Sequence, residues 1–85
     1  MNSKLEIFKK KLIYRAGYRG TKEMDILLSS FVNKHIDNFD EKQLIELDKF
    51  LSFDDETILN FYHHDIKKNE IDKNAVSKIF KNFKL

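Results

Sequence analysis

The stretch that decides the fold runs from Tyr14 to Phe31 and reads YRAGYRGTKEMDILLSSF. It contains both glycines of the 85-residue chain, Gly17 and Gly20, among charged and aromatic side chains. An apolar stripe at helical spacing follows at once. The stripe comprises Met24, Leu27, Leu28, Phe31 and Val32. The pattern predicts a polar joint between two helices, and such a cluster is more typical of a recognition surface than of a filler loop.

The ends of the two helices at this joint can be read from residue types. Gly17 suits the position just past the first helix, where a left-handed backbone is favoured. Thr21 is a suitable N-cap for the second helix, with Glu23 and Asp25 in the first turn, where the helix dipole favours acids. If the second helix starts near Arg19, then Arg19 and Glu23 lie four residues apart on one face.

Two interpretations of the joint stay open at this point. Arg19 and Glu23 form an ordinary surface ion pair worth about 0–1 kcal/mol, and Gly20 merely permits the turn. Alternatively, Gly20 lets the backbone of another protein come close, and Arg19 offers its planar fork to a carboxylate or carbonyl of that partner.

The rest of the chain shows helical periodicity as well, and no segment alternates with period two for long enough to predict a strand. The chain has no proline, so nothing in it interrupts a helix. Helix starts are predicted at capping residues: Ser3 and Asp40 in capping boxes with Glu6 and Gln43, Thr21, Asp54 or Asp55, and Asp72. We therefore predict an all-α fold, a compact bundle of five short helices, in one domain spanning residues 1–85.

Apolar side chains expected in the core recur at i, i+3 and i+4 in each of these helices. Beside the stripe after the joint they are Leu5, Phe8, Leu12, Leu44, Leu47, Leu51, Ile58, Leu59, Phe61, Tyr62, Ile71, Val76, Ile79, Phe80 and Phe83.

Charge is distributed unevenly along the chain. Residues 1–22 carry seven basic side chains and one acid, whereas residues 37–56 carry eight acids and two lysines. This asymmetry either steers a charged partner or matches one helix against another within the fold.

Several classes of protein are disfavoured by composition. The absence of cysteine excludes disulfides and thiolate metal sites. No apolar run approaches the ~20 residues that span a bilayer, and the N-terminus lacks the apolar core of a signal peptide. We expect no membrane insertion and a location in a bacterial cytoplasm, with the mitochondrial matrix as the alternative for a processed form.

Motifs for metal binding or catalysis are weak. His63, His64 and Asp65 with His35 suggest a metal site, but adjacent helical residues point about 100° apart, so we predict none. Ser29 and Ser30 lack a recognisable base. With two glycines, the chain is also a poor candidate to enclose a dinucleotide. We predict no catalytic residue and no enzyme activity.

The segment LIYRAGYRGTKEMDILLSSF, residues 12–31, resembles the signature of the succinate dehydrogenase assembly factor 2 family, small FAD assembly factors also called flavinators. That family carries an R-G-x-x-E motif, matched here by Arg19, Gly20 and Glu23. The likeness covers about residues 5–83 and includes EKQL at 41–44 with Asp48, and the stretch Asp54-Asp55 followed by an aromatic pair at 61–62. Two departures are the Gly17-Tyr18 pair, where members commonly have basic residues, and Thr21, where they often have Met.

The resemblance implies an assembly factor that binds the flavoprotein subunit of succinate dehydrogenase, or that of fumarate reductase, and promotes covalent attachment of FAD to it. FAD is then carried by the partner and not bound stably by this chain, which is expected to be a monomer when free. The implied partner-binding residues are Arg19, Gly20 and Glu23, flanked by Tyr14, Arg15, Tyr18 and Asp25. Asp25 has the alternative role of holding the start of the second helix.

Two other functions stay open. The positive first helix could bind nucleic acid, with an affinity that falls steeply with salt. The chain shows no recognition helix rich in Arg, Asn and Gln, and its pI near 8.8 is modest for such a protein. The remaining alternative is a general protein-interaction bundle with an unrelated partner.

Overall fold

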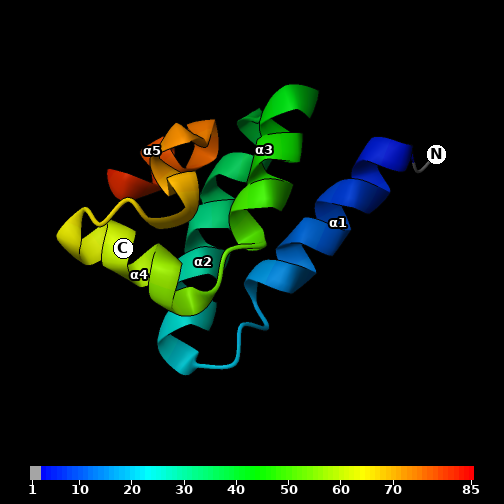
Figure 1. The fold of residues 1–85 in the computed structure, drawn as a ribbon. Helices are drawn as coiled ribbons and strands as arrows, with labels where there is room; N and C mark the ends of the chain where they lie inside the picture. Colours follow the sequence, from blue (N-terminus) through cyan, green and yellow to red (C-terminus); the bar gives the residue numbers. More distant parts are fainter. Residues whose placement is uncertain (1–2) are drawn as a thin grey trace.

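Five α-helices and two 3-10 helices follow one another along residues 3–85, the part of the chain that the computed structural model describes (Figure 1). They are α1 (Lys4–Ala16), α2 (Lys22–His35), η1 (Ile36–Asn38), α3 (Glu41–Leu51), α4 (Asp55–His64), η2 (Lys68–Lys73) and α5 (Ala75–Lys81). No strand occurs in residues 3–85. The predicted all-α fold with five short helices is confirmed.

Most of the predicted helix starts are also found. Side-chain oxygens accept hydrogen bonds from backbone N–H groups in the first turn at Ser3, Thr21, Asp40 and Asp54. The Asp40 capping box is complete, because Gln43 Oε1 also accepts from the Asp40 N–H at 3.0 Å. At Ser3 only the first half of the predicted box is recorded, with the Glu6 N–H donating to Ser3 Oγ at 3.2 Å.

The predicted cap of the last helix is wrong. Asp72 lies inside η2, and α5 is capped by Asn74, whose Oδ1 accepts from the N–H groups of Val76 and Ser77 at 2.8 and 3.0 Å. The Asn74 amide also donates to the Glu46 backbone carbonyl at 2.9 Å, which ties α5 to α3. A carboxylate can only accept, so an aspartate could cap the helix but could not make this second link.

Gly17 does lie just past the end of α1, as predicted, but the left-handed conformation expected for it is wrong. Gly17 has φ −90°, an ordinary value, and the left-handed residue of this joint is Gly20, with φ 110°. Gly17 instead permits a close helix crossing, because a Cβ at this position would lie 3.1 Å from Ser29 Oγ of α2. At the end of α4 the left-handed position is taken by Asp65, with φ 57°.

The core lies around α2 and α3, with α1 packed on one side and α4 and α5 on the other (Figure 1). Three phenylalanines from α2, α3 and α5 are fully buried at its centre: Phe31, Phe50 and Phe80. Helix α1 contributes less, since only Leu12 and Ala16 are buried and Leu5, expected in the core, is 37% exposed. Helix α1 therefore leaves large hydrophobic side chains in solvent, namely Leu5, Ile7 and Tyr14.

Candidate functional site

An open depression of about 500 Å³ lies between the end of α1, the joint and the start of α4. Six residues line it: Tyr14, Arg15, Tyr18, Arg19, Asp54 and Asp55. Four of the seven residues predicted to bind a partner are thus brought together here. Gly20, Glu23 and Asp25 lie outside the lining, on the joint and the first turn of α2.

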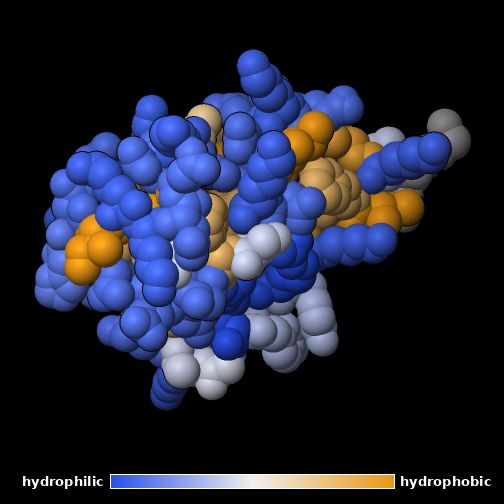
Figure 2. All heavy atoms as spheres, in the orientation of Figure 1, coloured by the Kyte–Doolittle hydropathy of each residue, from blue (hydrophilic) through white to orange (hydrophobic). Residues whose placement is uncertain are grey.

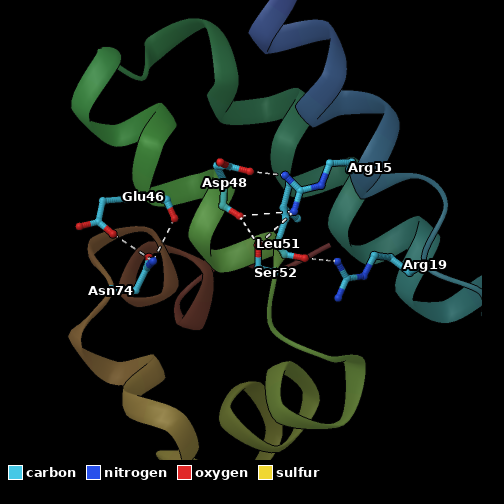
Figure 3. A network of polar contacts seen from close by, with 7 residues as sticks. All are labelled: Arg15, Arg19, Glu46, Asp48, Leu51, Ser52 and Asn74. Atoms are coloured by element: carbon cyan, nitrogen blue, oxygen red, sulfur yellow. Dashed lines mark hydrogen bonds and ion pairs between the residues drawn. The ribbon is translucent and has the colours of Figure 1, made fainter.

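Arg19 is the most deeply placed of these residues, with a side chain only 11% exposed. Its Nε is 2.9 Å from Asp55 Oδ1, and its two terminal nitrogens donate to the carbonyls of Leu51 and Phe53, each at 2.5 Å. These carbonyls belong to the end of α3 and the connection to α4, where backbone oxygens lack helical partners. Arg19 therefore binds the joint to the α3–α4 connection, and Figure 3 shows its guanidinium pointing to Leu51.

This geometry corrects two expectations about Arg19. Helix α2 begins at Lys22, so Arg19 lies before it and does not share a helical face with Glu23. The Arg19 fork is also not free, since all three of its nitrogens have partners within the fold. The carboxylate of Glu23 is exposed, and no hydrogen bond or ion pair of it is recorded in residues 3–85. Of the two charges, Glu23 is the one available to another molecule.

Arg15 makes a second and more exposed link between α1 and α3 (Figure 3). Its guanidinium pairs with the Asp48 carboxylate and donates to Ser52 Oγ at 3.3 Å. The side chains of Arg15 and Asp48 are 38% and 45% exposed. Together with the Arg19–Asp55 pair, this contact confirms one of the two interpretations of the charge pattern: basic residues near the N-terminus match acids of the middle segment within the fold.

The backbone of the joint is fixed by Asp25. Its Oδ1 accepts a hydrogen bond from the Arg19 N–H at 2.6 Å. The carboxylate therefore holds the chain just before α2, close to the alternative role predicted for it. Gly20 is exposed, and no atom lies within 4 Å of a Cβ placed on it. The joint is ordered from within, while its outer side at Gly20 stays open.

Two tyrosines project beside this joint: Tyr14 from the last turn of α1, and Tyr18 from the joint itself, two residues beyond the end of α1. The rings of Tyr14 and Tyr18 stack with centroids 4.4 Å apart and planes at 26°. They are 64% and 71% exposed, so neither contributes to the core. Paired aromatic side chains that remain in solvent are uncommon away from binding surfaces, and tyrosine is among the residues that contribute most at protein interfaces.

Two acids of the depression, Asp54 and Asp55, were not predicted as site residues. They were identified as candidate helix caps and as part of the family resemblance, and Asp54 does cap α4. Hydrogen bonds from Thr57 lower the pKa of the Asp54 carboxyl, and the bond from the Thr57 side chain contributes more than the bond from its backbone. The sequence feature that could have indicated them is the acidic segment 37–56, which predicts ion pairs with basic residues near the N-terminus but does not identify which residues pair.

The histidines lie away from this depression. His35, at the end of α2, packs against the rings of Phe31 and Phe39 with centroids 4.9 and 5.8 Å apart. Burial lowers the pKa of the His35 imidazole, and the charge of Lys34 lowers it further. His63 and His64 form the last turn of α4. Within residues 3–85 no three potential ligands gather to hold a metal ion.

Comparison with known proteins matches residues 10–84 to a family described as the flavinator of succinate dehydrogenase. A mitochondrial succinate dehydrogenase assembly factor 2 from Scheffersomyces stipitis is 37% identical over 81 residues, which cover 91% of this chain and 52% of that protein. The mitochondrial assembly factor 2-B of Drosophila simulans is 44% identical over 48 residues, 56% of this chain and 31% of its own length. The chain thus spans about a third to a half of these relatives.

No solved structure matches the chain. Among the helices described here, none has both the length and the apolar character needed to cross a membrane.

Proposed function

This chain belongs to the family of succinate dehydrogenase flavinators, and from that membership we propose that it binds the flavoprotein subunit of succinate dehydrogenase and promotes covalent attachment of FAD to it. The flavoprotein of fumarate reductase is a second candidate partner. The resemblance read from residues 12–31 is confirmed by the family match. A location in a bacterial cytoplasm stays a prediction, and the relatives named above are described as mitochondrial.

The observation that carries this proposal is the exposed pair of tyrosines, Tyr14 and Tyr18, on a segment that neighbouring arginines fix to the rest of the fold. Tyr14 and Tyr18 stand in solvent, whereas Arg15 and Arg19 beside them are tied to α3 and to the α3–α4 connection. A surface that is already ordered loses little conformational entropy when it binds, so more of the contact energy appears as affinity. The same ordering would let the surface hold a partner in one arrangement.

In this proposal the charged residues of the R-G-x-x-E motif have different roles. Arg19 acts inside the fold and sets the position of Tyr18 and the joint. The groups offered to the partner are the two tyrosine rings, the open side of Gly20 and the Glu23 carboxylate. Asp25 supports them by holding the backbone of Arg19.

FAD itself is proposed to stay on the partner. The depression presents the carboxylates of Asp54 and Asp55, which repel a pyrophosphate, and the guanidinium of Arg19 is already occupied. The residues present therefore do not fit the cofactor. The chain would act by favouring the partner conformation in which its own reacting groups are correctly placed, which is a contribution of orientation and not of chemistry.

Two substitutions at Gly20 test the proposal. Any side chain at φ 110° strains the backbone by about 1–3 kcal/mol, so Gly20→Ala and Gly20→Arg should lower stability to a similar extent. Only arginine adds bulk to the open side. We expect Gly20→Ala to retain binding of the purified flavoprotein subunit and Gly20→Arg to weaken it by about 100-fold, as for a change at an interface hot spot.

Binding is measured by isothermal titration calorimetry, and covalent flavin by in-gel fluorescence of the flavoprotein subunit. Circular dichroism melts of both variants supply the control for folding. If Gly20→Arg bound the subunit as tightly as Gly20→Ala, the assignment of this face would be wrong. If the unmodified chain neither bound the subunit nor increased its covalent flavin, the proposed function itself would be wrong.

A further inference from the structure

Helix α1 carries a second depression on its outer face, adjoining the first. It encloses about 400 Å³ and is lined by Ile7, Lys10, Lys11, Tyr14 and Arg15, with carbon atoms forming almost all of its wall. Tyr14 and Arg15 line both depressions, so the two form one continuous surface along α1. We call the second depression the α1 groove.

The α1 groove follows from the helical repeat. Ile7, Lys10 or Lys11, and Tyr14 recur every three or four residues, so they form one stripe that is about 10 Å long at 1.5 Å per residue. This stripe is distinct from the side that packs on the body, where Leu12 is fully buried. Ile7 is 46% exposed. Hydrophobic atoms also show among hydrophilic side chains along the N-terminal part of α1 in Figure 2.

The rim of the α1 groove is positively charged and largely uncompensated. Lys10 and Lys11 are exposed, and the ion pairs recorded in residues 3–85 include neither of them. Their methylene stems cover the apolar floor while their ammonium groups remain in water. Arg15, at the end nearer the first depression, is already paired with Asp48. The groove therefore offers an apolar floor between two free cations.

We propose that the α1 groove binds an acidic segment of the flavoprotein subunit, one that places an apolar side chain on Ile7 with carboxylates facing Lys10 and Lys11. This inference rests on the proposed function and extends the same interface by two turns of α1. The carbon floor disfavours a nucleic-acid backbone, which would bring phosphates and no apolar group to it. Charge complementarity selects carboxylates at the rim.

The charge arm of the test compares two double variants of the full chain. Lys10→Glu with Lys11→Glu reverses the rim, and Lys78→Glu with Lys84→Glu makes the same change in net charge at the exposed lysines of α5 and the C-terminus. We expect the first pair to weaken binding of the flavoprotein subunit by about tenfold or more at low salt, mainly through the association rate. The second pair should have little effect. The difference should shrink at about 1 M salt, where charges interact over only about 3 Å.

The apolar arm uses two isoleucines of equal exposure. Ile7→Asp removes the floor of the α1 groove, and Ile66→Asp changes a residue that is 47% exposed and lies two residues after α4, a helix on the opposite side of the core from α1 (Figure 1). We expect Ile7→Asp to weaken binding by about tenfold and Ile66→Asp to leave it unchanged. Circular dichroism of all variants checks that α1 remains folded.

Three results overturn the inference while leaving the proposed function intact. The first is binding of the subunit by the unmodified chain that Ile7→Asp and the Lys10/Lys11 reversal both leave unchanged. The second is equal weakening by the two lysine reversals, which would indicate net charge alone. The third is self-association of the free chain, seen by analytical ultracentrifugation and removed by Ile7→Asp, which would assign the groove to a second copy. Failure of the unmodified chain to bind would instead remove the proposed function and this inference with it.

Discussion

The aromatic core and the polar joint hold the molecule together by different means. In the core, Phe31 of α2 lies 5.1 Å from Phe80 and 6.2 Å from Phe50, measured between ring centroids, and all three rings are fully buried. At the joint, Arg15 pairs with Asp48 of α3. Arg19 pairs with Asp55 at the start of α4 and donates to a backbone carbonyl at the end of α3. The contacts of the core are buried, apolar and non-directional, whereas the ion pairs and hydrogen bonds of the joint are partly exposed and directional.

The contrast indicates where stability and function reside. Burial of large aromatic side chains supplies most of the free energy of folding in so small a chain. Partly exposed ion pairs supply little, but their geometry fixes where α1 and its tyrosines lie. We therefore expect changes in the core to cost more folding free energy than changes at the joint. Four predictions test this division, beginning with the largest effect.

The largest effect is expected from Phe31→Ala in the core. Removing this ring leaves a cavity among the other phenylalanines and should cost about 3–5 kcal/mol. A chain of this length has a total stability on the order of 5 kcal/mol, so the variant should keep at most about 2 kcal/mol of it and unfold at a much lower urea concentration than the wild type. Urea denaturation followed by circular dichroism measures this. Phe31→Leu, which fills much of the same space, serves as the control and should still unfold cooperatively.

A core substitution with no more effect than a joint substitution would break the comparison. Phe31→Ala retaining a cooperative transition near the wild-type midpoint would be that result. It would mean that the polar contacts of the joint supply most of the free energy of folding.

The second effect is expected at Arg19. Arg19→Ala leaves Asp55 and two carbonyls without their donor, and we expect a loss of about 2 kcal/mol, in the range for hydrogen bonds to a charged group. Asp55→Ala should cost less, because Arg19 keeps its two carbonyl partners. Arg19→Lys should not restore stability, since one ammonium cannot reproduce the three-pronged fork.

A double-mutant cycle on Arg19 and Asp55 isolates their ion pair from the carbonyl contacts. We expect a coupling of about 1 kcal/mol, because the arginine is nearly buried but the Asp55 side chain is 28% exposed. A coupling near zero would show that Arg19 acts through the carbonyls alone. A coupling as large as the Phe31→Ala effect would contradict the distinction between the two regions.

The sequence predicted the parts of this structure that depend on neighbouring residues. The apolar stripe of α2 and the capping box of α3 are local patterns, and both are found. Arg19 meets Asp55 across 36 positions, and its position before α2 depends on where Thr21 begins the helix. The charge layout indicated that the basic segment 1–22 and the acidic segment 37–56 attract each other, but helical periodicity alone does not determine which residues form ion pairs.

The backbone conformations were less predictable than the helices. A left-handed residue was expected at Gly17, but beyond Gly20 the positive φ values fall on Asp65, Asn69 and Glu70. Glycine is the usual signal for such positions, and tertiary contacts can impose them on other residues. For the candidate site, four lining residues were predicted, whereas Asp54 and Asp55 were not predicted as site residues, because their approach to α1 is set by the packing of α3.

The third effect concerns the crossing of α1 and α2 at Gly17. A Cβ there would lie 3.1 Å from Ser29 Oγ, so Gly17→Ala should destabilise the fold by about 0.5–1 kcal/mol, toward the lower end of core overpacking. In a Ser29→Ala background the obstructing oxygen is gone. Because φ at Gly17 is ordinary, alanine should then be neutral or stabilise the fold by about 0.4–1 kcal/mol through the unfolded chain. Thermal melts of the wild type, the two single variants and the double variant measure the change of sign, and its absence would show that packing at this crossing is loose.

The smallest effect is expected from the pH dependence of the joint. The hydroxyl and backbone N–H of Thr57 hold the pKa of Asp54 below its ordinary value of 3.8, and Lys68 and Arg19 add favourable charge. A carboxyl with a lowered folded pKa stabilises the fold fully above 3.8, and this contribution is lost as the pH falls through the lower folded value. Asp54→Asn keeps an oxygen that caps α4 but cannot titrate. Below pH 3.8 the urea midpoint of the wild type should therefore fall more steeply than that of Asp54→Asn, while at neutral pH the two should be close. Asp54 is exposed to water, so this difference should be smaller than any effect above.

Phe31→Leu supplies the matching measurement in the core: its midpoint should follow the wild-type pH curve at a constant offset, because no titrating group is removed. Parallel curves for the wild type and Asp54→Asn would show that the Thr57 cap does not link this end of the joint to pH.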